Sequence, residues 1–220
     1  MANEVALLDF WASPFGMRAR VALAEKGVEY EFIEQNLSNK SELLLRMNPV
    51  HKKIPVVVHN DKPVCESLII VQYIDEVWSN NTSTTLLPSD PYLRAQAHFW
   101  ADFADKKVYE SATRIWSTKG KDSELAKKEF IEHLTVLEQH LGDKPYFGGD
   151  TFGFLDVAVI PFYTWFYTFE MAGNFKVEDS CPKIIAWAKR CLLRDSVKAL
   201  PDQKKVYEFF LQLKKMLGIE

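Results

Sequence analysis

Hydrophobic and polar positions follow two different patterns along the chain, and the change of pattern divides it into two parts. Residues 1–80 contain short apolar runs separated by longer amphipathic stretches and turn residues. Such runs predict buried strands, and the stretches between them predict helices. Beyond residue 90 the apolar residues recur at helical spacing, and no equally clear strand pattern follows. We therefore expect an α/β domain at 1–80, a linker at 81–89 and an all-helical domain at 90–220.

The first part has the element order of a thioredoxin-like domain: strand, helix, strand, helix, strand, strand, helix. Helices between the early strands imply parallel pairing there. Asn60 and Asp61 predict a turn that returns the last strand antiparallel. The predicted strands are 5–8, 30–33, 54–58 and 62–65, and the predicted helices are 17–26, 41–47 and 68–78.

The second part predicts five or so helices. The first begins at Asp90 and ends at Gly120. A nearly all-apolar helix at 154–171 is expected to be a buried central helix rather than a membrane span, because Asp156 and Pro161 interrupt it. Gly153 and Asp156 have the spacing of half a capping box, which indicates a role in folding. The other predicted helices are 123–141, 182–193 and one that starts at Asp202, with Val206, Phe209, Phe210, Leu213 and Leu217 on one face.

Composition narrows the function classes. The chain has 220 residues and a net charge of -3, which gives no electrostatic footprint for nucleic acid. Its three cysteines, Cys65, Cys181 and Cys191, form no zinc or disulfide framework, and free thiols fit a reducing compartment. The N-terminus lacks a signal peptide pattern. We expect a cytoplasmic protein without a membrane span or a bound metal.

The strongest candidate for chemistry is Ser13, in the turn between the first strand and the first helix. Pro14 suits the first helical position, so Ser13 is an N-cap candidate. The alternative is functional: the hydroxyl faces a ligand at the helix N-terminus, where free N–H groups and the helix dipole favour negative charge. The local pattern leaves both interpretations open.

Three further features lie in the same domain, and each has two interpretations. Pro55 is an ordinary trans proline at a strand start, or a cis proline that leaves the Ile54 backbone free for an extended ligand. Ser67 caps a helix, or it acts with Glu66 on a ligand with a carboxylate and an ammonium group. The basic residues Lys40, Lys52 and Lys53 form a solvated face, or they bind carboxylates.

Together these motifs resemble those of a glutathione transferase, closely those of the plant tau class, over essentially all of the chain. The motifs are Ser13-Pro14-Phe15-Gly16, Asn48-Pro49-Val50-His51-Lys52-Lys53-Ile54-Pro55-Val56, Glu66-Ser67, and Gly148-Gly149-Asp150 with Phe154-Leu155-Asp156. The resemblance implies the glutathione transferase fold, with a thioredoxin-like domain and a helical domain. It also implies that Ser13 is the catalytic hydroxyl, and that Lys40 and Lys53 bind the glycyl carboxylate of glutathione.

The remaining sites follow from the same resemblance. Ile54, before a cis Pro55, would pair with the cysteinyl backbone of glutathione, and Glu66 and Ser67 would bind its γ-glutamyl end. The electrophile site would be lined by Trp11, Phe15, Tyr109, Thr113, Trp165, Phe209 and Leu213.

The expected function is conjugation of glutathione to apolar electrophiles in detoxification or the stress response, with a possible peroxidase side activity. Glutathione is a cosubstrate, no further cofactor is expected, and the resemblance implies a homodimer. A cysteine at position 13 would favour a thiol–disulfide reductase, but the residue is serine. The alternative is a non-catalytic carrier (a ligandin) for apolar planar molecules, because an aromatic cleft serves either purpose.

Overall fold

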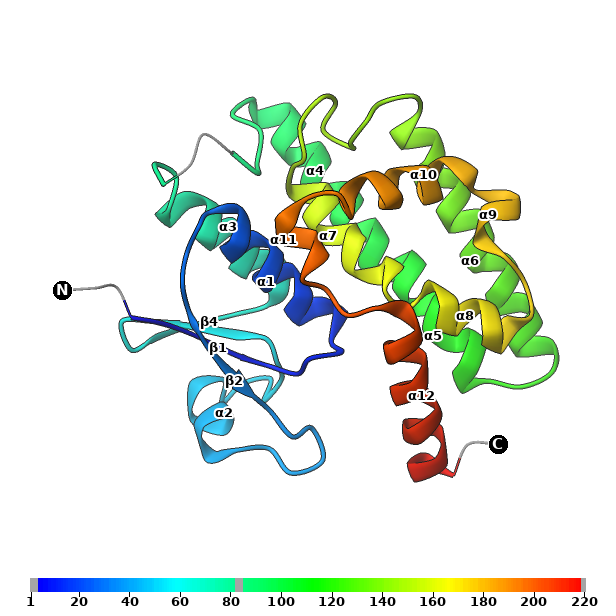
Figure 1. Cartoon of the computed structure of the whole chain (residues 1–220), viewed down its shortest axis with the longest axis horizontal. Helices are drawn as coiled ribbons and strands as arrows, with labels where there is room; N and C mark the ends of the chain where they lie inside the picture. Colours follow the sequence, from blue (N-terminus) through cyan, green and yellow to red (C-terminus); the bar gives the residue numbers. More distant parts are fainter. Residues whose placement is uncertain (1–3, 82–84, 219–220) are drawn as a thin grey trace. The chain divides into compact units, whose positions relative to one another are not determined.

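The computed structural model describes residues 4–81 and 85–218. The chain divides after Pro88 into two compact units, Met1–Pro88 and Ser89–Glu220 (Figure 1). Residues 82–84 of the expected linker lie outside the described residues. All the described strands belong to the first unit.

The first unit is a four-stranded mixed sheet in the order β2-β1-β3-β4. Parallel pairing of the early strands is confirmed for β1 with β2. It is wrong for β3, which pairs antiparallel with β1 because the chain after α2 enters beside the end of β1, where Leu8 pairs with Val56. The elements are β1 (Val5–Asp9), α1 (Pro14–Glu25), β2 (Glu31–Glu34), α2 (Glu42–Met47), β3 (Val56–His59), β4 (Lys62–Cys65) and α3 (Ser67–Val77).

Helices cover both faces of this sheet. Figure 1 shows α1 and α3 together on one face and α2 on the other. The α2 face has a core of Leu8, Leu44 and Val56, all fully buried. The predicted hairpin between β3 and β4 is confirmed, and Asn60 and Asp61 both adopt the positive φ of 49° and 63° that tight hairpin turns need.

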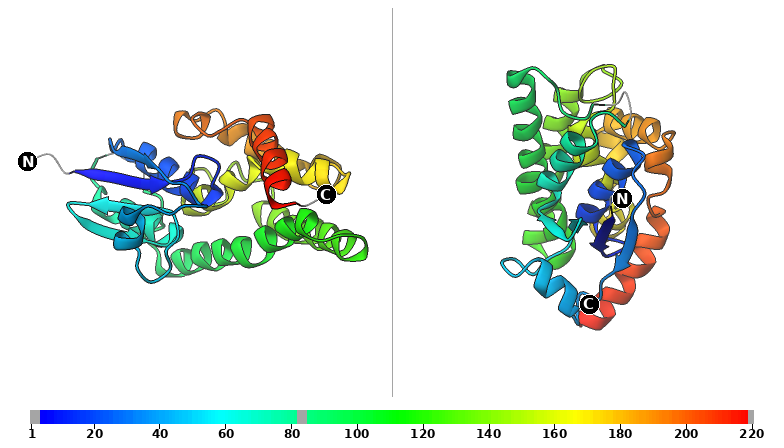
Figure 2. Two further views of the ribbon diagram at one scale, coloured as in Figure 1. Left: turned by 90° about the horizontal axis from the view of Figure 1, so that it is seen from below. Right: turned by 90° about the vertical axis from the view of Figure 1, so that its left-hand side faces the viewer.

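In its described part the second unit consists of helices joined by loops, with one isolated β-bridge between Tyr146 and Gly149. Figure 2 shows α4, η1 and α5 as one continuous rod with α6 alongside. The elements are α4 (Pro91–Phe103), η1 (Ala104–Tyr109), α5 (Glu110–Ser117), α6 (Lys121–Leu141), α7 (Phe154–Tyr163), α8 (Phe166–Gly173), α9 (Val177–Ser180), α10 (Pro182–Cys191), α11 (Asp195–Lys198) and α12 (Gln203–Leu217).

The long first helix of this unit differs from the prediction in two ways. Residues 104–109 form a π-helix, so the helical phase changes in mid-course, which a strict 3.6-residue pattern does not anticipate. The helix ends at Ser117, and Gly120 is the N-cap of α6 rather than the stop of the preceding helix. Its N-cap is predicted correctly, because the Asp90 carboxylate accepts the Leu93 N–H at 2.9 Å.

The predicted single central helix is wrong, because the structure has two helices there, α7 and α8. Pro161 lies within α7, and the break follows two residues after it. Backbone bonds shift to i−3 at this point: the Thr164 N–H donates to the Pro161 carbonyl and the Trp165 N–H to the Phe162 carbonyl. The half capping box is confirmed, since the Gly153 N–H donates to Asp156 Oδ2 at 2.9 Å.

The last helix, α12, begins as predicted, with Asp202 as N-cap. Val206 and Phe210 are buried, whereas Phe209 and Leu213 are half-buried. The side chain of Leu217 lies outside the described residues.

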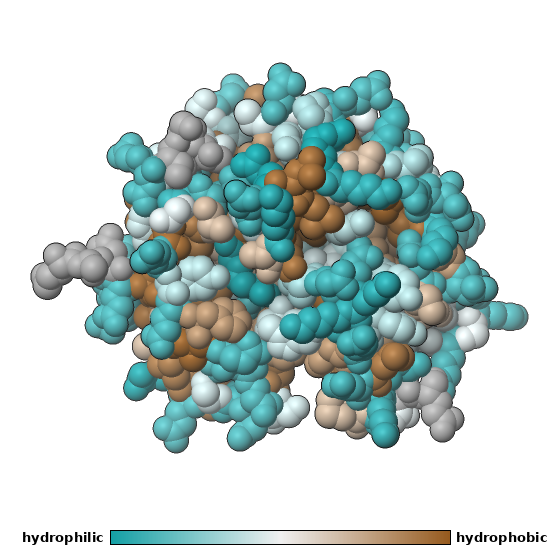
Figure 3. All heavy atoms as spheres, in the orientation of Figure 1, coloured by the Kyte–Doolittle hydropathy of each residue, from teal (hydrophilic) through white to brown (hydrophobic). Residues whose placement is uncertain are grey.

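Hydrophilic side chains cover most of the face shown in Figure 3, with apolar side chains exposed in patches between them. In the part of the chain that the structure describes, every helix is too short or too polar to cross a membrane.

Candidate functional site

Ser13 lies in the turn between β1 and α1. It is the N-cap of that helix, as predicted, and its Oγ accepts the Gly16 N–H at 3.2 Å, with Pro14 in the first turn. A serine hydroxyl has two acceptor positions and one donor hydrogen. Capping uses an acceptor position, so the O–H remains able to donate to a ligand. The capping and functional interpretations are therefore compatible.

A second helix N-terminus, that of α3, belongs to the same unit. Its N-cap is Glu66, with a φ of 70° that non-glycine residues rarely adopt, and the Glu66 side chain does not cap the helix. Strained backbone of this kind costs on the order of 1–3 kcal/mol and is concentrated at ligand-binding sites. The prediction that Ser67 is the N-cap is wrong, because Ser67 is the first helical residue.

Arg18 connects the two helix N-termini. Its side chain is fully buried, and its Nη1 donates to Ser67 Oγ at 3.0 Å. A guanidinium buried in α1 therefore fixes the first residue of α3 relative to the helix that starts after Ser13. Sequence analysis missed this residue, because an arginine within an amphipathic helix looks like a solvated one.

The loop before β3 supplies the third part of the site. The Ile54–Pro55 bond is cis, one of the two possibilities that the sequence left open. Asn48 shapes this loop from within: its Nδ2 donates to the Lys53 carbonyl at 2.9 Å, and its Oδ1 accepts the His51 N–H at 3.1 Å. Sequence analysis treated Asn48 only as a helix breaker and missed this role.

Three charged residues of the predicted glutathione site lie at the surface of the first unit. Lys40, Lys53 and Glu66 are exposed. His51 Nε2 lies 3.9 Å from Glu66 Oε1, which brings the loop before β3 close to the start of α3. Exposed lysines and the N-termini of α1 and α3 together give this part of the unit partners for carboxylates.

The predicted electrophile residues are divided between the two units. Trp11 and Phe15 flank Ser13 and are half-buried. In the second unit, Tyr109 is the last residue of the π-helix and stacks on Phe162, with ring centroids 5.3 Å apart. The remaining residues are also half-buried: Thr113 on α5, Trp165 at the break between α7 and α8, and Phe209 and Leu213 on α12.

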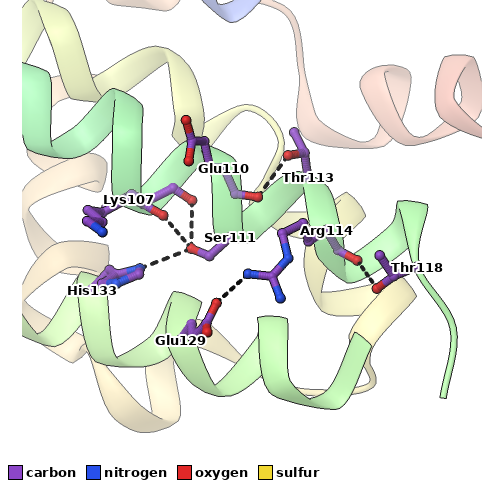
Figure 4. A network of polar contacts seen from close by, with 9 residues as sticks. Lys107, Glu110, Ser111, Thr113, Arg114, Thr118, Glu129 and His133 are labelled. Carbon is purple, nitrogen blue, oxygen red and sulfur yellow. Dashed lines mark hydrogen bonds and ion pairs between the residues drawn. The ribbon is translucent and has the colours of Figure 1, made fainter. Parts of the chain in front are cut away.

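A polar network joins η1 and α5, which carry Tyr109 and Thr113, to α6 (Figure 4). Ser111 Oγ lies 2.6 Å from the Lys107 carbonyl and 3.2 Å from His133 Nδ1. Burial lowers the pKa of His133, and the nearby positive charge of Lys107 lowers it further. His133 is therefore a neutral hydrogen-bonding partner at pH 7. In the described ranges, 4–81 and 85–218, no cluster of His, Cys, Asp and Glu could hold a metal ion.

Comparison with known proteins agrees with this geometry. The family model "Glutathione S-transferase, N-terminal domain" matches residues 3–76, and the model "Glutathione S-transferase, C-terminal domain" matches residues 96–190. A curated "Glutathione S-transferase U19" of Arabidopsis thaliana is 62% identical over 98% of both chains. A "Probable glutathione S-transferase parC" of Nicotiana tabacum is 61% identical over the full length of both.

Solved structures give the same result. A rice glutathione transferase crystallised in complex with glutathione has a TM-score of 0.93 and 49% identity over 98% of both chains. A tau-class glutathione S-transferase from mango has a TM-score of 0.90 and 45% identity, and the match covers 96% of this chain and 98% of that one. The chain belongs to the glutathione transferase family, in its plant tau class.

Proposed function

We propose that this protein transfers glutathione to apolar electrophiles, with Ser13 donating a hydrogen bond to the glutathione sulfur. The observation that carries the proposal is that the N-cap serine at the start of α1 uses its Oγ as an acceptor, which leaves its hydroxyl hydrogen for a ligand. A second helix N-terminus at Glu66–Ser67 and the cis Ile54–Pro55 bond lie in the same unit. The rice relative, whose structure was solved in complex with glutathione, supports the choice of cosubstrate.

In this proposal the peptide is held mainly through its charges and its backbone. Lys40 and Lys53 bind the glycyl carboxylate, and the backbone of Ile54 pairs with the cysteinyl residue. Glu66 and Ser67 bind the γ-glutamyl end, where the N-terminus of α3 favours a carboxylate. The exposure of Lys40, Lys53 and Glu66 leaves these three side chains accessible to a ligand.

The protein's task is to stabilise the thiolate. A free thiol has a pKa of about 8.5, so lowering it to about 7 needs roughly 2 kcal/mol of selective stabilisation. A hydrogen bond to a charged acceptor supplies about 1.5–3 kcal/mol, and a helix N-terminus adds about 0.3–1 kcal/mol. One hydroxyl therefore suffices without a general base. The sulfur then attacks the electrophile held by the aromatic side chains; with an aromatic halide the C–S bond forms, the C–halogen bond breaks and halide leaves.

The test is conjugation of glutathione to a generic aromatic halide. We expect Ser13→Ala to lower turnover at neutral pH by about tenfold to a hundredfold, the loss of one charge-assisted hydrogen bond, with binding of glutathione nearly intact. Ser13→Thr keeps the hydroxyl and should retain much of the activity. Equal turnover of wild type and Ser13→Ala would refute the role of Ser13.

Ser41 offers a matched control, because it caps α2 as Ser13 caps α1. Its Oγ accepts the Leu44 N–H at 3.1 Å. Ser41→Ala removes a helix cap, worth about 1 kcal/mol, and should leave the turnover unchanged. A similar fall in turnover for Ser41→Ala and Ser13→Ala would mean that capping alone explains the effect.

The same assay separates transferase from carrier. Tight binding of apolar planar molecules without conjugation would favour the ligandin role. A hydroperoxide offered in place of the halide tests the peroxidase side activity. The same thiolate attacks the peroxide oxygen, the O–O bond breaks and the alcohol leaves; a second glutathione then reacts with the resulting sulfenic acid to give the disulfide and water. The electrophile residues proposed for each outcome are Trp11 and Phe15 in the first unit and Tyr109, Thr113, Trp165, Phe209 and Leu213 in the second.

We also propose that the protein is a cytoplasmic homodimer. Large apolar side chains are exposed on α3 and α4, among them Ile69 (58%) and Tyr92 (69%). An interface between two copies would bury such surfaces. The cysteines Cys65, Cys181 and Cys191 are free, which fits a reducing compartment. Light scattering after size exclusion tests the dimer, and a monomer at micromolar concentration would contradict it.

A further inference from the structure

Asp9, the last residue of β1, is a buried carboxylate that the proposed mechanism does not use. The residue is 0% exposed, and neither carboxylate oxygen has a hydrogen-bond partner. It forms an ion pair with Arg20, whose Nε lies 3.3 Å from Oδ2. Buried polar atoms in native proteins are nearly always hydrogen-bonded, so this carboxylate is an exception that calls for a physical reason.

The carboxylate lies against the turn that carries Ser13. A Cβ added to Gly16 would lie 1.7 Å from Oδ1 and 2.1 Å from Oδ2 of Asp9, so only a glycine leaves room for this side chain. Gly16 is also the residue whose N–H donates to Ser13 Oγ at 3.2 Å. The path from Asp9 Oδ1 to this Cβ, through the Cα and N of Gly16 and on to Ser13 Oγ, contains two covalent bonds of about 1.5 Å. The Asp9 carboxylate therefore lies within about 8 Å of Ser13 Oγ.

The groups around Asp9 also hold the backbone of the turn. Arg20 Nη2 donates to the Trp11 carbonyl at 2.8 Å, and Glu34 Oε1 accepts the Trp11 N–H at 3.2 Å. The charged and titratable groups that act on Asp9 are therefore Arg20 on α1, Glu34 on β2 and Tyr30 just before β2. Of these, Arg20 and Glu34 fix the backbone of residue 11, two positions before Ser13.

Burial is the main influence on the ionisation of Asp9. It raises the pKa of the carboxyl to about 7, although the charge of Arg20 and the nearby Phe10 N–H, which lies outside hydrogen-bond geometry, lower it in part and Glu34 raises it. Near pH 7 the group therefore exchanges between a neutral and a charged form. Arg20 is positive in both forms, so the two forms differ by one negative charge beside the Ser13 turn.

We propose that Asp9 is a positioning residue of the Ser13 turn, and that its ionisation opposes ionisation of the glutathione thiol bound there. The inference rests on the proposed function, in which Ser13 binds the sulfur. Two like charges at about 10 Å in a partly buried site disfavour each other by about 0.5–1 pH unit. The neutral form of Asp9 therefore favours the reactive thiolate, and each deprotonation makes the other harder.

The test is a pH titration of bound glutathione, followed by the ultraviolet absorbance of its thiolate. We expect the wild-type curve to be broader than a single-proton curve. Asp9→Asn should give a single-proton curve with its midpoint about 0.5–1 pH unit lower. Affinity for S-methylglutathione, which has no thiol proton, should change less than about twofold. Superimposable curves for wild type and Asp9→Asn would overturn the proposal.

Two controls make the result specific. Asp61→Asn removes the same charge from an exposed hairpin turn of the same unit and should leave the curve unchanged. If Asp9→Asn does not fold, Asp9→Leu keeps a similar shape without charge and should show the same shift. An unshifted curve for a folded Asp9→Leu would overturn the proposal equally.

Failure of the proposed function gives a different result. If Ser13→Ala leaves the wild-type midpoint in place, Ser13 does not stabilise the thiolate, and the mechanism fails. The Asp9→Asn shift can still be measured in that case. If the midpoint is unchanged in Asp9→Asn but changed in Ser13→Ala, only the proposed role of Asp9 is refuted.

Discussion

Asp9 in the first unit and Asp156 in the second are both fully buried carboxylates, but their surroundings differ. Asp156 accepts three hydrogen bonds: from the Phe147 N–H at 3.0 Å, the Gly153 N–H at 2.9 Å and Trp187 Nε1 at 2.7 Å. Asp9 accepts none by the same geometric standard. Burial raises the pKa of both, Asp9 to about 7 and Asp156 to about 6.

We infer from this difference that Asp156 stabilises the fold, whereas Asp9 acts on the turn that carries Ser13. Asp156 ties the start of α7 to a loop and to α10, and its three donors offset part of the loss of hydration. Asp9 keeps an unsatisfied carboxylate next to the turn of Ser13. Proteins tolerate such local violations mainly at functional sites. The contrast predicts opposite responses when each charge is removed.

The largest effect is expected at Asp156. Asp156→Ala leaves two backbone N–H groups and the Trp187 indole N–H buried without a partner. We expect the free energy of unfolding to fall by about 3–5 kcal/mol in denaturant titrations. Asp156→Asn keeps one acceptor oxygen and should lose less. A loss below about 1 kcal/mol for Asp156→Ala would contradict the folding role.

Removing the Asp9 charge should have the opposite effect at high pH and raise the free energy of unfolding. Its folded pKa of about 7 lies above the ordinary value of 3.8, so the folded state retains a proton that the unfolded state releases. The free energy of unfolding should therefore fall as pH rises from about 4 to about 7, by up to about 1.4 kcal/mol per pH unit from this group. Asp156 acts in the same direction up to about pH 6.

Replacing the Asp9 carboxyl tests this pH dependence directly. Asp9→Asn should remove the contribution of Asp9 to the fall in the free energy of unfolding with pH. The variant should then be about 1–3 kcal/mol more stable than wild type at pH 8. Denaturant titrations at pH 5 and pH 8 measure the effect. A larger stability difference in favour of Asp9→Asn at pH 5 than at pH 8 would contradict the sign.

Gly16→Ala should lower stability by about 1–3 kcal/mol, because the new Cβ meets the Asp9 carboxylate. Adding Asp9→Ala removes the obstacle. The double variant should then be more stable than the sum of the two single effects, by about 1 kcal/mol or more. Additive effects in this double-mutant cycle would mean that the two residues do not touch.

The smallest effect is expected for a partly exposed ion pair. Glu129 on α6 pairs with Arg114 on α5 at 2.5 Å, and both side chains are about one-third or more exposed (Figure 4). Glu129→Gln should change the free energy of unfolding by less than about 1 kcal/mol. A larger loss would show that ion pairing, rather than burial, determines how much a carboxylate contributes to the free energy of unfolding.

The features predicted well from sequence depend on local contacts. The caps at Ser13 and Asp90, the Asn60-Asp61 hairpin and the Asp156 box all involve residues within a few positions of one another. Turn and cap chemistry is recorded in adjacent residues, so a single sequence contains it. The family motifs, also continuous in sequence, carried the assignment to glutathione transferases.

The features that could not be predicted from the sequence depend on contacts between residues far apart in the chain. The antiparallel direction of β3 depends on where the loop after α2 re-enters the sheet. The Arg18–Ser67 bond and the Asp9–Gly16 contact require the folded first unit. The π-helix at 104–109 changes the helical phase, which a regular apolar stripe conceals.

The most direct test of the account is the ionisation of glutathione bound at the Ser13 turn, measured in wild type and in Ser13→Ala. The account predicts a wild-type midpoint near pH 7 and a midpoint close to that of the free thiol, about 8.5, once the hydroxyl is gone. The same midpoint in both proteins would contradict it.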